Sequence, residues 1–148
     1  MKIEDFKNDF DAIFLQELSF FIEKVKKNLA SENINIYIEY IKNLASNGKR
    51  IRPYNAALIY NIYSNKDWHN IKNTLIGIEL IHLMALIHDD VMDNSDTRHG
   101  VLSAHSYIEK DLHDKIDEHT ADHTSRSIAV LLGDLVFSWG YTEFSKDN

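Results

Sequence analysis

The sequence predicts an all-α protein, and three of its features support that prediction. Its 148 residues include one proline and five glycines, so few positions interrupt regular backbone structure. Apolar residues recur at intervals of three and four along most of the chain, which is the spacing of an amphipathic helix. With 44% hydrophobic and 26% charged residues, the chain is of ordinary globular composition and can bury one sizeable core.

Six helices account for this periodicity, with ends defined to within about two to four residues. The expected helices span residues 4–29, 33–46, 52–64, 67–93, 102–115 and 124–145. The first has a broad apolar stripe, made of Phe6, Phe10, Ile13, Phe14, Leu18, Phe21, Ile22 and Val25. This stripe is typical of a core-facing helix surface and suggests no chemistry.

Charge and cysteine content exclude several kinds of protein. The 16 basic and 23 acidic residues give a net charge of −7, which disfavours a nucleic-acid partner. The absence of cysteine excludes disulfides, thiolate metal sites and cysteine nucleophiles, and it fits a reducing compartment. We therefore expect a cytoplasmic protein that does not bind nucleic acid.

The apolar segments do not predict export or a membrane span. The first twenty residues have neither a basic start nor a continuous apolar run, so they do not resemble a signal peptide. The most apolar stretch, residues 75–87, contains Glu79 and His82 and is shorter than the roughly 20 apolar residues that a span requires. The sequence therefore predicts a soluble protein.

A basic loop is expected between the second and third helices. Lys49, Arg50 and Arg52 lie immediately before Pro53, a residue suited to the start of a helix. Free amides at a helix start, together with these cations, would suit a phosphate or diphosphate group. The alternative interpretation is a solvated basic turn.

An acidic cluster ends the most apolar helix. Residues 67–93 would span about 40 Å as one helix, at 1.5 Å per residue. Asp89, Asp90 and Asp93 lie at its carboxyl end, where the helix dipole disfavours acids. Local stability therefore does not explain them, whereas a bound cation would. The alternative is a surface acidic run that caps the next segment.

The spacing within this cluster favours magnesium. Asp89 and Asp93 are four residues apart and lie within about 40° on one face, whereas Asp90 points roughly 100° away. Oxygen ligands without cysteine suit Mg²⁺, which is usually completed by water and substrate phosphates. Val91 and Met92 break the pattern of a calcium-binding EF-hand loop. The cluster is thus interpreted as half of a metal-diphosphate site.

Two histidines leave a second kind of enzyme open. His82 lies seven residues before Asp89, about 10 Å up nearly the same helix face, and is either a site residue or a satisfied core histidine. His88 directly precedes Asp89. Together they would also fit a helical metal-dependent phosphohydrolase, in which histidine and aspartate ligate the metal.

Three segments in this order carry a resemblance to a known family: GKRIRP at 48–53, ELIHLMALIHDDVMDNSDTRHG at 79–100 and SIAVLLGD at 127–134. The chain resembles the N-terminal half of the trans-isoprenyl diphosphate synthases, the polyprenyl synthetase family of farnesyl and geranylgeranyl diphosphate synthases. The resemblance implies an antiparallel helical bundle of the isoprenoid synthase (class I terpenoid synthase) type, here incomplete. Residues 1–148 would be the N-terminal half of that domain, with the first aspartate-rich motif.

The resemblance also implies a reaction, the Mg²⁺-dependent head-to-tail (1'-4) condensation of isopentenyl diphosphate with an allylic diphosphate. Asp89, Asp90 and Asp93 would form the catalytic aspartate motif, with Asp89 and Asp93 holding the metal. The substrate-binding residues would be Gly48, Lys49, Arg52 and His82 for isopentenyl diphosphate, Arg98 for the allylic diphosphate, and His99. Arg50 matches the motif without an assigned contact, and Gly133 and Asp134 are interpreted as helix-packing residues.

Two departures from the family pattern bear on activity. His99 stands where the family usually has a second arginine, which would make one isopentenyl diphosphate contact weaker and dependent on pH. A second aspartate-rich motif is also missing. The chain is therefore expected to be an inactive fragment of a homodimeric enzyme or, alternatively, a non-catalytic partner subunit of a prenyltransferase. The phosphohydrolase ranks third, because GKRIRP has no role in it.

Product length is expected to depend on the residues just before the motif. The family's chain-length position is the fifth residue before the first aspartate, here Met84, and Ala85 adjoins it. Both would border the channel for the growing tail, and neither is aromatic. We therefore expect a product of about twenty carbons or more.

Overall fold

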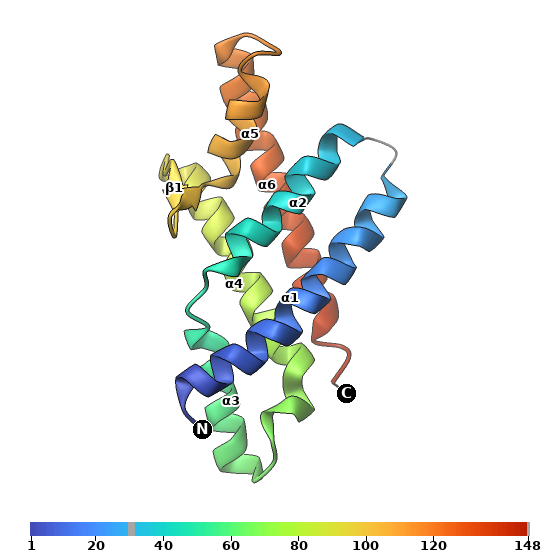
Figure 1. Ribbon diagram of the computed structural model, residues 1–148, viewed down its shortest axis with the longest axis vertical. Coiled ribbons are helices and arrows are strands. Elements are labelled where there is room, and N and C mark those ends of the chain that lie inside the picture. The colour runs from blue at the N-terminus through green and yellow to red at the C-terminus, as the bar shows by residue number, and fades with distance from the viewer. Residues whose placement is uncertain (30–31, 148) are drawn as a thin grey trace.

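The computed structural model describes residues 1–29 and 32–147, and in this part of the chain the fold is all-α, as predicted (Figure 1). The elements in chain order are α1 (Ile3–Asn28), α2 (Glu32–Ser46), α3 (Ile51–Ser64), the 3₁₀ turn η1 (Trp68–Ile71), α4 (Lys72–Met92), β1 (Thr97–Arg98), β2 (Val101–Leu102), α5 (Ala104–Leu112) and α6 (Glu118–Glu143).

Helices α4 and α6 form the centre of the bundle and run antiparallel (Figure 1). They cross closely at two glycines: a methyl group added to Gly77 would lie 2.9 Å from the carbonyl oxygen of Gly140. A methyl group on Gly140 would in turn lie 3.0 Å from Cβ of Leu80. The small residues therefore allow the two backbones to approach, which fixes the position of α4 and of the charged groups along it.

Helix α1 covers this centre with the apolar stripe that the sequence predicts. Phe6, Phe10, Phe14, Leu18 and Ile22 are all buried. Phe6 and Phe10 stack with their ring centroids 5.3 Å apart. Because truncating a buried phenylalanine to alanine typically costs about 3–5 kcal/mol, this stripe anchors α1 firmly.

Three of the predicted helix boundaries are wrong, and capping side chains explain two of them. The helix expected at 67–93 is divided, because Asp67 caps a 3₁₀ turn at His69 and α4 begins only at Lys72. The helix expected at 124–145 begins at Glu118, because the Asp117 side chain accepts a hydrogen bond from the Thr120 amide.

The helix expected at 102–115 is shortened by a hairpin that the sequence analysis missed. Strands β1 and β2 pair antiparallel, and α5 begins at Ala104, after the Ser103 cap. The turn between the strands consists of His99 and Gly100, with φ angles of 51° and 86°. Two positive φ angles are characteristic of a type I′ hairpin turn.

No helix in residues 1–29 and 32–147 is both long enough and apolar enough to cross a membrane.

Candidate active site

A small cavity lies between α4, the hairpin turn and the loop before α3. Its volume is about 120 Å³. Its lining includes Gly48 and the polar residues Lys49, Arg50, Arg52, Glu79, His82 and His99, and its apolar wall includes Leu83 and Leu86. The structure thus brings residues of the 48–53 and 79–100 motifs together at one cavity, as the resemblance implies for Lys49, Arg52 and His82.

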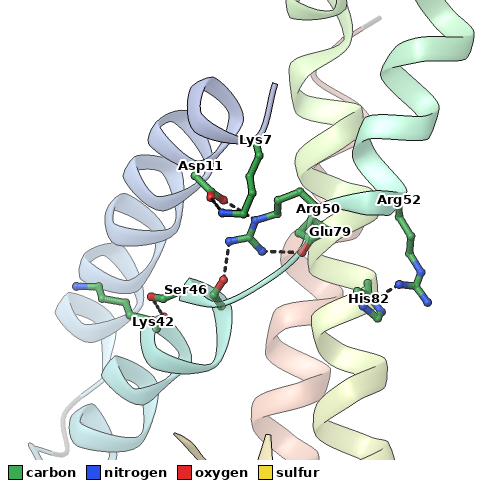
Figure 2. A network of polar contacts seen from close by, with 9 residues as sticks. Lys7, Asp11, Lys42, Ser46, Arg50, Arg52, Glu79 and His82 are labelled. Carbon is green, nitrogen blue, oxygen red and sulfur yellow. Dashed lines mark hydrogen bonds and ion pairs between the residues drawn. The ribbon is translucent and has the colours of Figure 1, made fainter. Parts of the chain in front are cut away.

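Arg52 and His82 form a direct pair at this cavity (Figure 2). The Arg52 guanidinium lies 2.8 Å from Nε2 of His82. Because arginine is only a donor, Nε2 must accept, and the ring carries its proton on Nδ1. Burial lowers the pKa of His82 below its ordinary value, and the charge of Arg52 lowers it further. His82 is therefore a neutral, half-buried ring on the cavity wall.

Arg50 does not share the orientation of its two basic neighbours. Lys49 and Arg52 are exposed, whereas Arg50 is only 3% exposed and its guanidinium turns into the protein (Figure 2). The sequence predicts that all three cations surround one bound anion. The structure separates them into two exposed cations and one buried cation with its own acidic partners, Asp11 and Glu79.

Gly48 has a close neighbour that the resemblance did not imply. A methyl group at Gly48 would lie 2.8 Å from Cζ of Arg50 and 3.0 Å from Oε1 of Glu79. The glycine therefore makes room for the buried Arg50 guanidinium, whatever approach of a diphosphate it also allows.

The acidic end of α4 divides as the helical geometry predicts. Asp89 and Asp93 are exposed, one turn apart, while Asp90 is 1% exposed. Asp90 accepts hydrogen bonds from Nε of Arg98, at 2.9 Å, and from Nη2 of the same residue. The expectation that local stability explains none of these acids is therefore wrong for Asp90, whose charge Arg98 neutralises.

Arg98 lies in β1, at the acidic end of α4, and its side chain is 28% exposed. The hydrogen bond that Arg98 donates to Asp90 is the main cause that raises the pKa of Arg98, and the charges of Asp89 and Asp93 add to it. The guanidinium therefore stays charged, beside carboxylates that would otherwise repel one another.

The exposed aspartates fit a magnesium ion as part of its ligand set. In residues 1–29 and 32–147, no three histidine, aspartate or glutamate side chains gather as a preformed metal site. Mg²⁺ commonly takes one or two protein carboxylates and fills its octahedron with water and phosphate oxygens. Two exposed carboxylates one helical turn apart match that chemistry.

His88 lies on a different side of α4 from this pair. Its Nε2 is 3.1 Å from the carbonyl oxygen of Val130 and 3.7 Å from Oδ1 of Asp134. A methyl group at Gly133 would lie 2.5 Å from Cδ2 of His88, which confirms that Gly133 is a packing residue. The ring thus packs on α6, and nothing in this arrangement favours the phosphohydrolase.

An apolar cavity of about 340 Å³ adjoins the first one. It shares Arg52 and His82 with it, and its other lining residues are Ile78, Ile81, Ala85 and Phe144. Met84 is not among them and packs against the hydrophobic core. Sequence reasoning missed Ile78 and Ile81, although their spacing from Ala85 and His82 on one helix face is a detectable signal.

Comparison with known proteins identifies the family. The family model of the polyprenyl synthetases matches residues 34–147. The chain belongs to the polyprenyl synthetase family. This confirms the resemblance drawn from its three motifs.

The short chain isoprenyl diphosphate synthase of Methanocaldococcus jannaschii is 30% identical over 141 residues, which is 94% of this chain and 37% of that protein. The heptaprenyl diphosphate synthase component 2 of Geobacillus stearothermophilus is 40% identical over 57 residues, 38% of this chain and 18% of that protein.

Among solved structures, the geranylgeranyl pyrophosphate synthase of Corynebacterium glutamicum, complexed with isoprenyl diphosphate and magnesium, superposes with a TM-score of 0.75. It is 26% identical, and the match covers 93% of this chain and 41% of that one. The isoprenoid synthase fold is thereby confirmed. The polyprenyl synthetase chain spans less than half the length of these relatives.

Proposed function

We propose that this chain is part of a prenyl diphosphate synthase, which condenses isopentenyl diphosphate with an allylic diphosphate in the presence of Mg²⁺. The observation that carries the proposal is the cavity where Lys49 and Arg52 meet His82 of α4, the helix whose carboxyl end bears the exposed pair Asp89 and Asp93. A cationic cavity and an acidic pair on one helix suit two substrates that both carry diphosphate.

In this proposal the cationic cavity binds isopentenyl diphosphate. The exposed ammonium of Lys49 and guanidinium of Arg52 supply charge-assisted hydrogen bonds to phosphate oxygens. His82 holds the Arg52 guanidinium in place, and His99 lies at the rim where the family usually has arginine. Binding there orients the isopentenyl double bond towards the second substrate, and orientation supplies much of the rate.

The allylic diphosphate would bind at the acidic end of α4. Asp89 and Asp93 would hold Mg²⁺, which neutralises the charge that develops on the leaving diphosphate. Arg98, fixed by Asp90, would add its guanidinium to the same diphosphate. Leu83 and Leu86 give the cavity an apolar wall that excludes water from the reacting carbons.

The decisive experiment is a product assay on two proteins, the protein as its gene encodes it and the 148-residue chain by itself. Each is incubated with isopentenyl diphosphate and allylic diphosphates of several lengths, with Mg²⁺ or with EDTA. We propose that residues 1–148 are the N-terminal half of the enzyme. The encoded protein should then form elongated products only with Mg²⁺, and the isolated chain should form almost none. No product from the encoded protein with any substrate would refute the function.

A partner subunit remains the second proposal, because one relative is named as a component of a heptaprenyl diphosphate synthase. In that case the encoded protein would be inactive alone and would gain activity only when a second prenyltransferase subunit is added. For the preferred function we expect a homodimer by light scattering. We also expect the protein in the cytoplasm, which cell fractionation tests.

A further inference from the structure

The buried Arg50 joins three separate helical elements through its guanidinium (Figure 2). Nε donates to Oδ1 of Asp11 in α1 at 2.5 Å, and Nη1 donates to Oε1 of Glu79 in α4 at 2.6 Å. Nη2 donates to the carbonyl oxygen of Ala45, in the last turn of α2, at 2.6 Å. The guanidinium also lies 4.6 Å from the ring centroid of Phe14. We call Asp11, Arg50 and Glu79 the arginine latch.

The backbone at Arg50 requires such support. Its φ of 55° lies in the left-handed region, which a non-glycine residue seldom adopts without compensation. Directly after it, α3 begins with Ile51 and Arg52. The same residue that makes the three hydrogen bonds therefore also sets the direction in which the chain enters α3.

The latch and the cavity use neighbouring positions of α4. Glu79 and His82 are three residues apart, so they lie on the same face of the helix. Glu79 binds Arg50, and His82 accepts from Arg52, two residues later in the first turn of α3. Two parallel contacts thus fix the loop and the start of α3 against α4, one buried and one exposed.

Asp11, the latch residue in α1, lies outside the part of the chain that the family model matches. Asp11 and Phe14 belong to α1, whereas the match covers residues 34–147. Asp11 also pairs with Lys7, and its side chain is only 18% exposed. Helix α1 therefore has a polar connection to the cationic cavity, in addition to its apolar packing.

We propose that the arginine latch is a positioning device, which holds Lys49 and Arg52 in the arrangement that binds isopentenyl diphosphate. This inference rests on the proposed function and adds Asp11 and Arg50 to the residues on which the cavity depends. Neither of them is proposed to touch substrate. A buried ion-pair network by itself is weak evidence for stability, so a role in fixing geometry accounts better for it.

The test is a kinetic comparison of variants in the protein as its gene encodes it. Asp11→Ala removes one partner of the latch outside the cavity, and Asp9→Ala makes the same change at an exposed position of the same helix. Arg50→Lys keeps the charge but loses the planar fork that reaches three acceptors. Asp11→Glu keeps the carboxylate. Each variant is assayed well below its melting temperature.

The latch predicts that Asp11→Ala and Arg50→Lys raise the KM for isopentenyl diphosphate about tenfold, with the KM for the allylic diphosphate within about twofold of wild type. Asp9→Ala should match wild type, and Asp11→Glu should recover part of the loss. If Arg50→Lys fails to fold, the KM values of Asp11→Ala and of its control Asp9→Ala still test the positioning role of the latch.

Three outcomes would overturn the latch. A merely structural role would lower the active fraction, so Vmax would fall while both KM values stayed the same. An equal rise of both KM values would show that the effect is not confined to the cationic cavity. If the wild type makes no product at all, the proposed function fails, and the purpose assigned to the latch fails with it.

Discussion

Near its middle, α4 contributes Glu79 and His82 to a cavity closed by the loop before α3, whereas its last turn presents Asp89 and Asp93 to solvent. The cationic cavity is assembled by contacts within the protein, since Arg50 and Arg52 each have partners on α4. The acidic pair belongs to no cluster of three metal-binding side chains in the described part of the chain.

The difference in organisation between the cationic cavity and the acidic pair follows from electrostatics. At the cationic cavity, Asp11 and Glu79 balance the charge of Arg50 within the fold, while Lys49 and Arg52 remain as exposed cations. Asp89 and Asp93 are like charges near one another, and only a cation brings them together favourably. The comparison teaches that the cationic cavity is organised by contacts within the protein, while the acidic pair has no such organisation of its own and, in the proposed function, is completed by its ligands.

The largest expected effect is the loss of turnover at the acidic pair. In the protein as its gene encodes it, Asp89→Asn or Asp93→Asn should lower kcat at least about 100-fold, roughly 2.7 kcal/mol in the barrier, because the Mg²⁺ ligand is lost. The melting temperature should change little, because both side chains are exposed.

Asp96→Asn is the matched control, since Asp96 is also exposed and lies beyond the end of α4. It should keep nearly full activity. If Asp89→Asn stayed within about tenfold of wild type, the metal role of this pair would be wrong.

Asp90→Asn should show that Asp90 stabilises the fold, in contrast to the metal-binding role proposed for Asp89 and Asp93 in the same motif. The substitution leaves the Arg98 guanidinium without its buried counter-charge, so the free energy of unfolding should fall by about 2–3 kcal/mol. Urea denaturation measures this loss. In a double-mutant cycle with Arg98→Met, a coupling energy near zero would contradict the ion pair.

Product length should respond to Ala85 more than to Met84. The sequence points to Met84, but in the structure Ala85 lines the apolar cavity and Met84 packs on the core. Ala85→Phe should fill that cavity and shorten the product by at least one isoprene unit, as chromatography of the dephosphorylated products would reveal. A larger shortening from Met84→Phe would place the channel on the other side of α4.

The smallest expected effect is on the pH dependence of stability. Burial lowers the pKa of His82 and of His105, so both rings are neutral when folded at neutral pH. At a pH between these lowered pKa values and the ordinary histidine pKa of 6.5, the unfolded chain binds more protons than the folded chain. Stability should therefore be full above about pH 6.5 and decline as the pH falls through the lowered values.

His105→Gln should reduce the loss of stability at low pH, whereas His119→Gln at an exposed position should leave that loss unchanged. Thermal melting between pH 5 and pH 8 provides the measurement. A wild-type melting temperature that rises as the pH falls over this interval would have the wrong sign.

The sequence predicts what depends on local periodicity. The separation of Asp90 from Asp89 and Asp93 follows from the pitch of one helix, and the buried stripe of α1 follows in the same way. The burial of Arg50 could not be predicted locally, because its partner Asp11 lies 39 residues away. One signal was present: Glu79 interrupts an apolar helix, and a buried acid requires a cationic partner.

The hairpin at Arg98 escaped prediction for a different reason. Its strands have two residues each, too few for a recognisable alternation, and the positive φ of His99 replaces the more familiar asparagine or glycine signal. The position of Arg98 beside Asp90 depends on this turn. The site could therefore be assembled from sequence only by resemblance, and its geometry only from the fold.

The account is tested most directly by calorimetric titration of the protein as its gene encodes it. Isopentenyl diphosphate and an unreactive allylic thiolodiphosphate are each titrated with Mg²⁺ and with EDTA. Isopentenyl diphosphate should bind with similar affinity in both conditions, because its cavity is built from protein cations. The allylic analogue should bind tightly only with Mg²⁺. If isopentenyl diphosphate also required the metal, or if the analogue bound equally well in EDTA, the contrast between the two sites would be wrong.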